Sequence, residues 1–106
     1  MALSVQKLKV GGIWVSPIEV ENTLLEHQAV LEAAVVGAED SDAIVKPKAY
    51  VVLRQGYTAS SQLTTDLQDF VKTKIAYYKY PRWIEFITEL PKTATGKIQR
   101  FKLREP

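Results

Sequence analysis

Hydrophobic and polar positions first alternate near the start of the chain. Within residues 7–15, two short alternating runs flank a Gly-Gly pair, and such runs around a turn that accepts positive φ predict a β-hairpin. Ser16, Pro17 and Glu19 then have the spacing of a helix start, in which Ser16 caps, Pro17 is the first helical residue and Glu19 completes a capping box. Apolar residues at helical spacing extend this predicted helix to about His27.

Three apolar runs, rich in β-branched or aromatic residues, predict the main strands. They cover residues 30–36, 48–54 and 82–87. An acidic loop at 38–42 separates the first two runs. Before the third, apolar residues recur at helical spacing to about Ile75, and the serines at 60–61 predict the cap of this second helix. A polar loop at 92–97 and a short basic helix near 99–104 are expected to follow.

The order of these elements is hairpin, helix, strand, strand, helix, strand, loop and helix. It predicts an α+β domain with an N-terminal β-hairpin followed by a small three-stranded sheet packed with helices. With 106 residues, the chain has the length of one compact domain, and it contains neither an internal repeat nor a linker. We therefore expect residues 1–106 to form a single domain.

Composition argues against several chemistries. There is no cysteine, and His27 is the single histidine, which excludes disulfides, thiolate metal sites, thiol nucleophiles and multi-histidine metal sites. No apolar run approaches the roughly 20 residues of a membrane span, and the first residues lack a secretory signal pattern. The net charge of +2 is too small to argue for nucleic-acid binding. We therefore expect no metal site, no membrane or nucleic-acid partner, and a cytoplasmic location.

Charge is distributed unevenly along the chain. Through Val71 there are 5 basic and 9 acidic residues, a balance of −4, whereas residues 72–106 hold 9 basic and 3 acidic residues, a balance of +6. A segment with an excess of one sign is typical of a surface that meets the opposite sign. The C-terminal part is therefore expected to bind something anionic.

Residues 91–100 hold the strongest candidate for chemistry, the run Pro-Lys-Thr-Ala-Thr-Gly-Lys-Ile-Gln-Arg. Its glycine and threonines predict a loop with Lys97 at the tip, while Lys92 and Arg100 raise the surrounding positive potential. An ammonium group with three donors suits an oxyanion. The run lacks the pattern of a phosphate-binding P-loop. From these residues alone, Lys97 is either a solvated loop lysine or an oxyanion-binding lysine.

Three motifs occur in an order that resembles one family. Residues 91–97 resemble the terminal catalytic-lysine motif of the adenylate-forming enzymes, the superfamily of acyl-CoA synthetases, luciferases and peptide-synthetase adenylation domains. Residues 9–21 resemble the hairpin-plus-helix motif that opens the C-terminal domain of these enzymes, and residues 78–82 resemble their Y-K-x-P-R motif. The resemblance covers nearly the whole chain and is nearest to AMP-forming aryl-acid CoA ligases of the benzoate type.

The resemblance implies that the chain is the C-terminal lid domain of a larger enzyme. The large N-terminal domain of the family, which carries the ATP, Mg²⁺ and acyl-acid sites, is absent from residues 1–106, so the fragment alone is expected to be inactive. Residues 1–6 also depart from the hinge pattern of the family, which is expected near Gln6. The implied partners are the N-terminal domain, CoA and the acyl-adenylate.

The resemblance also implies roles for individual residues. In the first half-reaction a carboxylate and ATP give an acyl-adenylate, and Lys97 offsets the repulsion between the carboxylate and the α-phosphate. In the second, the domain rotates and CoA displaces AMP. Four residues would then line the pantetheine tunnel, namely Gly11, Gly12, Ile13 and Trp14, and three would contact the nucleotide end of CoA, namely Tyr78, Lys79 and Arg82. Reversible acetylation of Lys97, by an acetyltransferase and a deacetylase, is a further implication because it removes the charge.

Alternatives stay open at several of these positions. Trp14 is equally interpreted as a packing anchor, and the glycines as a simple turn. The three tyrosines of this segment, Tyr77, Tyr78 and Tyr80, are equally interpreted as half-buried packing before a strand. For the whole chain, the alternatives are a free-standing basic interaction module and an adenylation domain that loads a carrier protein.

Overall fold

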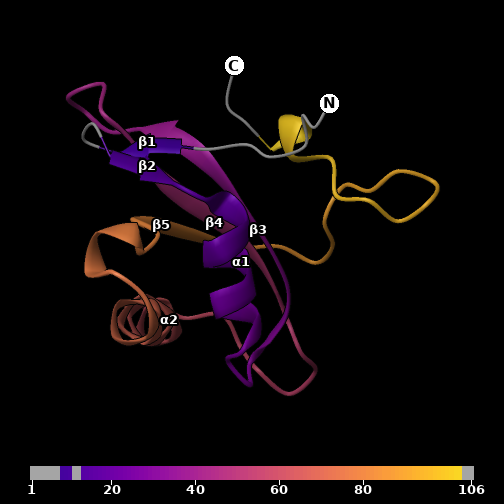
Figure 1. Cartoon of the computed structure of the whole chain (residues 1–106). Helices are drawn as coiled ribbons and strands as arrows, with labels where there is room; N and C mark the ends of the chain where they lie inside the picture. The colour runs from indigo at the N-terminus through magenta and orange to yellow at the C-terminus, as the bar shows by residue number, and fades with distance from the viewer. Residues whose placement is uncertain (1–7, 11–12, 104–106) are drawn as a thin grey trace.

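The computed structural model describes residues 8–10 and 13–103, so that Gly11 and Gly12 lie outside the described residues. Figure 1 shows the elements of the chain. In order they are β1 (Leu8–Val10), β2 (Ile13–Val15), α1 (Pro17–Leu25), β3 (Val30–Glu39), β4 (Val45–Leu53), α2 (Ser61–Lys74), η1 (Tyr77–Lys79), β5 (Trp83–Phe86) and η2 (Arg100–Lys102). The elements η1 and η2 are single 3-10 turns.

The strands form two sheets. β1 and β2 pair in antiparallel fashion, with Lys9 opposite Trp14, and make the predicted hairpin. The main sheet has the order β3-β4-β5. In it, β3 and β4 are antiparallel, with Val35 opposite Ala49, whereas β5 runs parallel to β4. Parallel neighbours need a crossover connection, which α2 supplies between β4 and β5. The predicted α+β class with a small three-stranded sheet is confirmed.

Both main helices begin at the predicted serines. The Ser16 hydroxyl oxygen accepts a hydrogen bond from the backbone N–H of Glu19 at 3.4 Å, and the hydroxyl oxygen of Ser60 accepts one from the first turn of α2 at 3.0 Å. The second half of the predicted capping box is wrong, because the Glu19 carboxylate binds the ammonium group of Lys79 at 2.6 Å instead. Helix α1 ends at Leu25, about two residues before the predicted end.

The strand ends also differ from the prediction. β3 continues to Glu39 and β4 begins at Val45, so the predicted acidic loop at 38–42 is replaced by a tight turn over residues 40–44. Glu39 alternates to the solvent side of the extended strand. The predicted basic helix near 99–104 is wrong in length, since it is a 3-10 turn of three residues, Arg100–Lys102.

The main sheet is the middle layer of the domain, with one apolar cluster on each face. On one face, residues of β3 and β4 pack against α1 and α2. This main cluster contains Val15, Val20, Leu24, Val30, Ala33, Val35, Ala49, Val51, Leu67 and Val71. The alternate residues of the same strands face the C-terminal segment in a second cluster. It contains Ala34, Val36, Tyr50, Val52 and Leu90, with Ile87, Ile98 and Leu103 against it.

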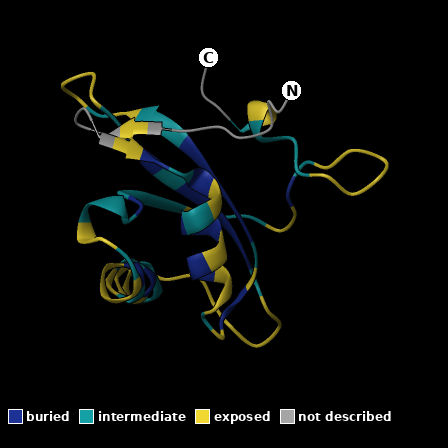
Figure 2. Cartoon of the chain, viewed as in Figure 1, coloured by how far each residue is buried: buried dark blue, intermediate teal, exposed yellow. Residues whose placement is uncertain are grey.

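Burial on both faces explains why the middle of β3 and of β4 is apolar at consecutive positions, residues 33–36 and 49–53. A strand with one solvated face alternates between apolar and polar residues, whereas a strand covered on both faces does not. Figure 2 shows the middle parts of the two strands buried between the helices and the C-terminal segment. The segment that carries the candidate lysine therefore belongs to a covering layer of the core.

Leu24 and Leu25 are neighbours on α1 in opposite environments, the first fully buried and the second 42% exposed. Replacing Leu24 by Ala leaves a cavity in the main cluster and should lower the free energy of unfolding by about 2–5 kcal/mol. Leu25→Ala is the matched control and should change it by about 0.5 kcal/mol or less. Urea unfolding of the chain measures both values, and equal losses would contradict this placement of α1.

Candidate functional site

Residues 91–99 form a hairpin that is closed at its neck. Lys92 and Ile98 make an antiparallel bridge, and the N–H of Gln99 donates to the carbonyl oxygen of Pro91 at 2.8 Å. One step further out, the N–H of Thr93 donates to the carbonyl oxygen of the residue at 97 at 2.8 Å. Figure 1 shows this lysine hairpin, defined here as residues 91–99, projecting from the body of the domain.

The turn of the lysine hairpin is fixed by threonine and glycine. The hydroxyl oxygen of Thr93 accepts a hydrogen bond from the N–H of Lys97 at 3.1 Å, and the hydroxyl groups of Thr93 and Thr95 lie 3.0 Å apart. Gly96 has a φ of +90°, which L side chains rarely adopt, although an added Cβ would meet no atom within 4 Å. The glycine is therefore required by the backbone conformation and not by lack of space.

Lys97 lies on the return arm of the hairpin, one residue before the neck, and not at the tip as predicted. Its side chain is exposed. Within the described ranges 8–10 and 13–103, no hydrogen bond or ion pair engages its ammonium group. The ammonium group is therefore available to an anionic ligand, on a backbone that is held at both arms.

Two ion pairs hold the base of the lysine hairpin against the body of the domain. The ammonium group of Lys92 pairs with the carboxylate of Glu32 on β3, and the guanidinium of Arg100 pairs with the carboxylate of Glu21 on α1. Sequence analysis predicts that Lys92 and Arg100 add positive potential around Lys97. The structure corrects this, because each cation is paired with a carboxylate within the domain.

Glu21 is a site residue that sequence analysis missed. It is only 5% exposed, and its Oε2 accepts hydrogen bonds from the N–H of Val35 and from Nε of Arg100, both at 2.7 Å. Its Oε1 accepts a further bond from Nη2 of Arg100, and hydrogen bonding to Glu21 raises the pKa of that guanidinium. The signal was present, since Glu21 has the helical spacing of the buried positions 17, 20 and 24.

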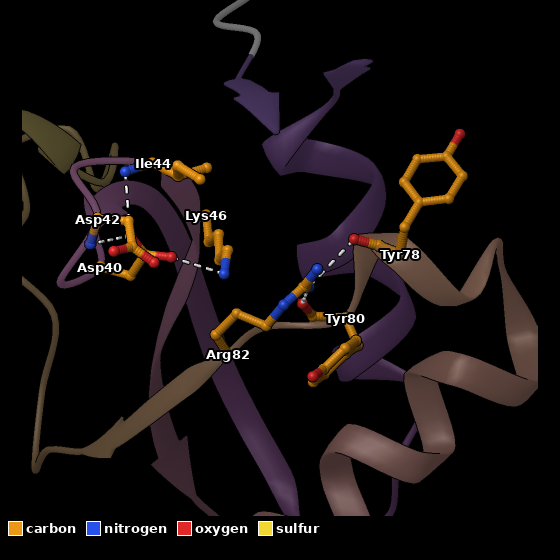
Figure 3. Close-up of polar contacts among 7 residues, drawn as sticks. All are labelled: Asp40, Asp42, Ile44, Lys46, Tyr78, Tyr80 and Arg82. Atoms are coloured by element: carbon orange, nitrogen blue, oxygen red, sulfur yellow. Dashed lines mark hydrogen bonds and ion pairs between the residues drawn. The ribbon is translucent and has the colours of Figure 1, made fainter. Parts of the chain in front are cut away.

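The predicted CoA-contacting residues lie around η1, where their cations also have internal partners. Nη1 of Arg82 donates to the carbonyl oxygens of Tyr78 at 3.1 Å and Tyr80 at 2.6 Å (Figure 3). The guanidinium also lies over the Tyr80 ring, 4.1 Å from its centroid. Lys79 pairs with Glu19, which ties η1 to the start of α1. Arg82 and Lys79 therefore shape this turn.

The tyrosines of this segment differ in exposure. Tyr78 and Tyr80 are half-buried and pack against the main cluster, as the packing interpretation expects. Tyr77 instead is 72% exposed and meets the edge of the Tyr78 ring at a centroid distance of 6.1 Å. Of the three tyrosines, Tyr77 therefore has the ring that is most open to a ligand or another domain.

Of the four residues predicted to line the tunnel, two lie outside the described part of the chain. Gly11 and Gly12 fall there, and Ile13 is described only by its backbone in β2. Trp14 is 60% exposed, with the ammonium group of Lys9 5.5 Å from its ring centroid. Such exposure does not fit a buried packing anchor. In Figure 1 the hairpin of β1 and β2 and the turn η1 lie on one side of the domain, and the lysine hairpin lies on the other.

The carboxylate of Asp40 stabilises the turn at residues 40–44. Oδ1 of Asp40 accepts hydrogen bonds from the N–H groups of Asp42 at 2.8 Å and Ile44 at 3.0 Å, and Oδ2 pairs with Lys46 at 2.6 Å (Figure 3). Mainly through Lys46, and also through the N–H of Ile44, these bonds lower the pKa of Asp40 to about 2. The carboxylate closes the β3–β4 turn.

Among the described residues, no three His, Cys, Asp or Glu side chains are grouped so as to hold a metal ion. No described helix is long and apolar enough to cross a membrane. The single histidine, His27, accepts a hydrogen bond at Nδ1 from the N–H of Ala29 at 3.1 Å, and its ring packs edge-on against Phe70.

Comparison with known proteins gives consistent matches. Residues 19–97 match the AMP-binding enzyme C-terminal domain. The benzoate–CoA ligase of Thauera aromatica is 68% identical over 97 residues, which are 92% of this chain and 18% of the relative. The 4-hydroxybutyrate–CoA ligase 1 of Metallosphaera sedula is 49% identical over 98 residues, or 92% of this chain and 17% of the relative.

A solved structure of another CoA ligase matches the described chain in fold. The crystal structure of the anthranilate CoA ligase AuaEII in complex with anthranoyl-AMP matches with a TM-score of 0.86 and 59% identity, over 92% of this chain and 19% of that one. The described chain thus has the same fold as a segment of that ligase. It spans about a fifth of the length of these relatives.

The Asp40 turn predicts a pH-dependent stability. Because the pKa of Asp40 falls from its ordinary 3.8 to about 2 on folding, the contribution of its charge is present in full above about pH 4 and is lost as the pH falls towards 2. Asp40→Asn should therefore lower the free energy of unfolding near neutral pH, and the difference from the unchanged chain should shrink over that window.

Urea unfolding at several pH values measures this difference. Asp42→Asn is the control in the same turn, because no contact of the Asp42 side chain is found among the described residues, and it should have little effect at any pH. A cost of Asp40→Asn that stays constant from neutral pH to about pH 2 would contradict the role given to the Asp40–Lys46 pair.

Proposed function

The chain belongs to the family of AMP-binding enzyme C-terminal domains, and we propose that it is this domain of an AMP-forming acid–CoA ligase of the benzoate type. The reaction joins a carboxylate to the AMP part of ATP with release of pyrophosphate, and CoA then displaces AMP to give acyl-CoA. The observation that carries the proposal is Lys97, an exposed lysine without a partner among the described residues, on a hairpin closed at its neck.

Lys97 serves the first half-reaction. The attacking carboxylate and the α-phosphate are both anions, and an ammonium group placed between them offsets their repulsion and orients the attack. A lysine that had an internal ion pair would have to break it first. In this proposal ATP, Mg²⁺ and the acid bind mainly to the large N-terminal domain of the ligase.

The opposite side of the domain serves the second half-reaction, after a rotation of the kind that gates many enzymes. Gly11, Gly12, Ile13 and Trp14 then line the tunnel for the thiol arm of CoA. Two facts support this assignment: Trp14 is open to solvent, and the β1–β2 hairpin lies away from the lysine hairpin in Figure 1. One face for each half-reaction keeps the two sets of contacts from competing.

Tyr78, Lys79 and Arg82 contact the nucleotide end of CoA in this proposal. The internal hydrogen bonds of Arg82 use its Nη1, so its other donors are left for a phosphate, which guanidinium groups bind well. Lys79 has three donors, one of which goes to Glu19. Both cations can therefore bind phosphate without leaving the turn they shape.

The acid and the acceptor are inferred from the relatives. Their names include benzoate, anthranilate and 4-hydroxybutyrate, so ligases for chemically different acids share this domain, and the acid is selected elsewhere. The benzoate type rests on the 68% identity to one benzoate–CoA ligase. All three relatives are named as CoA ligases, which favours CoA over a carrier protein as acceptor and a ligase domain over a free-standing module.

Two substitutions in the full-length ligase should separate the half-reactions. Lys97→Ala should lower the rate of adenylation, measured by exchange of pyrophosphate into ATP, by about 10²- to 10³-fold, while thioester formation from supplied benzoyl-adenylate survives. Gly12→Leu should do the reverse, because a side chain there blocks the path of the thiol. Lys102→Ala removes an exposed lysine of η2 and is the charge-matched control. Equal losses in both half-reactions would refute the two-face assignment.

Lys97 is also proposed as a site of reversible acetylation. Transfer of an acetyl group from acetyl-CoA to Nζ forms an amide, releases the CoA thiol and a proton, and removes the charge that adenylation needs. The exposure of Lys97 supports this. After incubation with a protein lysine acetyltransferase and acetyl-CoA, mass spectrometry should show a gain at Lys97 that a deacetylase reverses, and no gain at Lys97 would refute it. A cytoplasmic location stays a prediction.

A further inference from the structure

Glu21 is the one carboxylate or cationic side chain among the buried residues that the structure describes. A carboxylate is costly to bury unless its oxygens are hydrogen-bonded and its charge is paired. Here both oxygens are engaged, by the N–H of Val35 on β3 and by two nitrogens of Arg100. Three segments distant in sequence therefore meet at one carboxylate: α1, the β3 strand and the end of the lysine hairpin.

Arg100 stands three residues after Lys97 and directly after Gln99, which closes the hairpin neck. Three residues of chain span at most about 10 Å, so a fixed Arg100 restricts where Lys97 can lie. The two parallel hydrogen bonds of a guanidinium to a carboxylate also fix an orientation, which a point charge does not.

The other arm of the hairpin is held differently. Leu90 is buried in the second cluster, and Lys92 pairs with Glu32 at a position where both side chains are about a third exposed. Exposed ion pairs of this kind add little and are screened by salt. Glu21 is buried and the Arg100 side chain is only a quarter exposed, so their two-point pair is the stronger geometric constraint on the arm that carries Lys97.

We propose that Glu21 and Arg100 are positioning residues for adenylation, which hold the return arm of the lysine hairpin so that Lys97 reaches the reacting carboxylate and phosphate. The inference rests on the proposed role of Lys97. It extends that role, because the position of Lys97 then depends on the contact of Arg100 with Glu21, which lies 79 positions earlier in the chain.

The test uses Arg100→Lys in the full-length ligase. The substitution keeps the positive charge beside Glu21 and loses the two-point contact. Adenylation kcat should fall by about 10- to 100-fold, as expected for a misplaced catalytic group, with KM values for ATP and acid unchanged and with the rate from supplied benzoyl-adenylate unchanged. A variant that merely destabilised the domain would lose both half-reactions together.

Glu21→Gln and the double variant sharpen the test. Glu21→Gln should lower adenylation kcat in the same way, and adding Arg100→Lys to it should cause little further loss, because both changes break one contact. Losses that multiply would show that the two residues act separately and would overturn the proposal. Hydrogen exchange of the peptide over residues 91–100 should rise in each variant, and unchanged protection would also count against it.

Lys102→Gln is the matched control. It removes a cation of the same 3-10 turn, where the side chain is exposed and no contact to Glu21 is described, so kcat and exchange should stay as in the unchanged enzyme. Lys97→Ala in the same assay distinguishes a failure of the proposed function from a failure of the positioning role. If Lys97→Ala leaves adenylation intact, the proposed function fails; if it abolishes adenylation while Arg100→Lys changes nothing, only the positioning role fails.

Discussion

Burial of both faces of the β3–β4 pair is the constraint on which the rest of the structure depends. Alternate residues of these strands belong to two apolar clusters, so the chain has to cover the sheet twice. The helices α1 and α2 cover one face, and the segment after β5 covers the other through Leu90, Ile98 and Leu103. Since Ile98 is also half of the bridge at the hairpin neck, the hairpin that presents Lys97 begins in the core and not in a loose terminal tail. The backbone of a lysine so placed loses little conformational freedom when the side chain binds, which favours the proposed role in adenylation.

Much of the fold is predictable because its signals are local. A serine at each N-cap, Pro17 in the first turn and apolar residues at helical spacing place both helices to within two residues. The misses have tertiary causes. β3 continues past Gly37 and β4 begins before Lys48. Asp40 and Lys46 close a turn that is tighter than the loop predicted from the acidic residues. The 3-10 turn η1 depends on carbonyl oxygens bound by a later residue, Arg82, and no local pattern encodes that.

The site divides in the same way. The motif makes Lys97 a candidate, and the glycine and threonines before it predict the loop, whereas the positive φ of Gly96 is seen only in the structure. The partners of the neighbouring cations are not found, because they lie far away in sequence: Glu19, Glu21 and Glu32 pair with Lys79, Arg100 and Lys92. These pairs also change the meaning of the uneven charge distribution, since acidic residues of the first part neutralise basic residues of the second. The excess of +6 therefore measures internal complementarity as much as an anion-binding surface.

Because of this pairing, the position of Lys97 says more about where an anion would bind than the total charge does. Lys92 and Arg100, the cationic residues that flank it on either side in sequence, each have a carboxylate, whereas Lys97 has none among the described residues. A surface evenly covered with free lysines would attract anions without orienting them, because long-range attraction acts on encounter and not on geometry. An unpaired ammonium group on an arm held by the two-point contact of Arg100 with the buried Glu21 acts at a defined place. In a reaction where two anions must approach each other in a defined geometry, that arrangement is the more useful one.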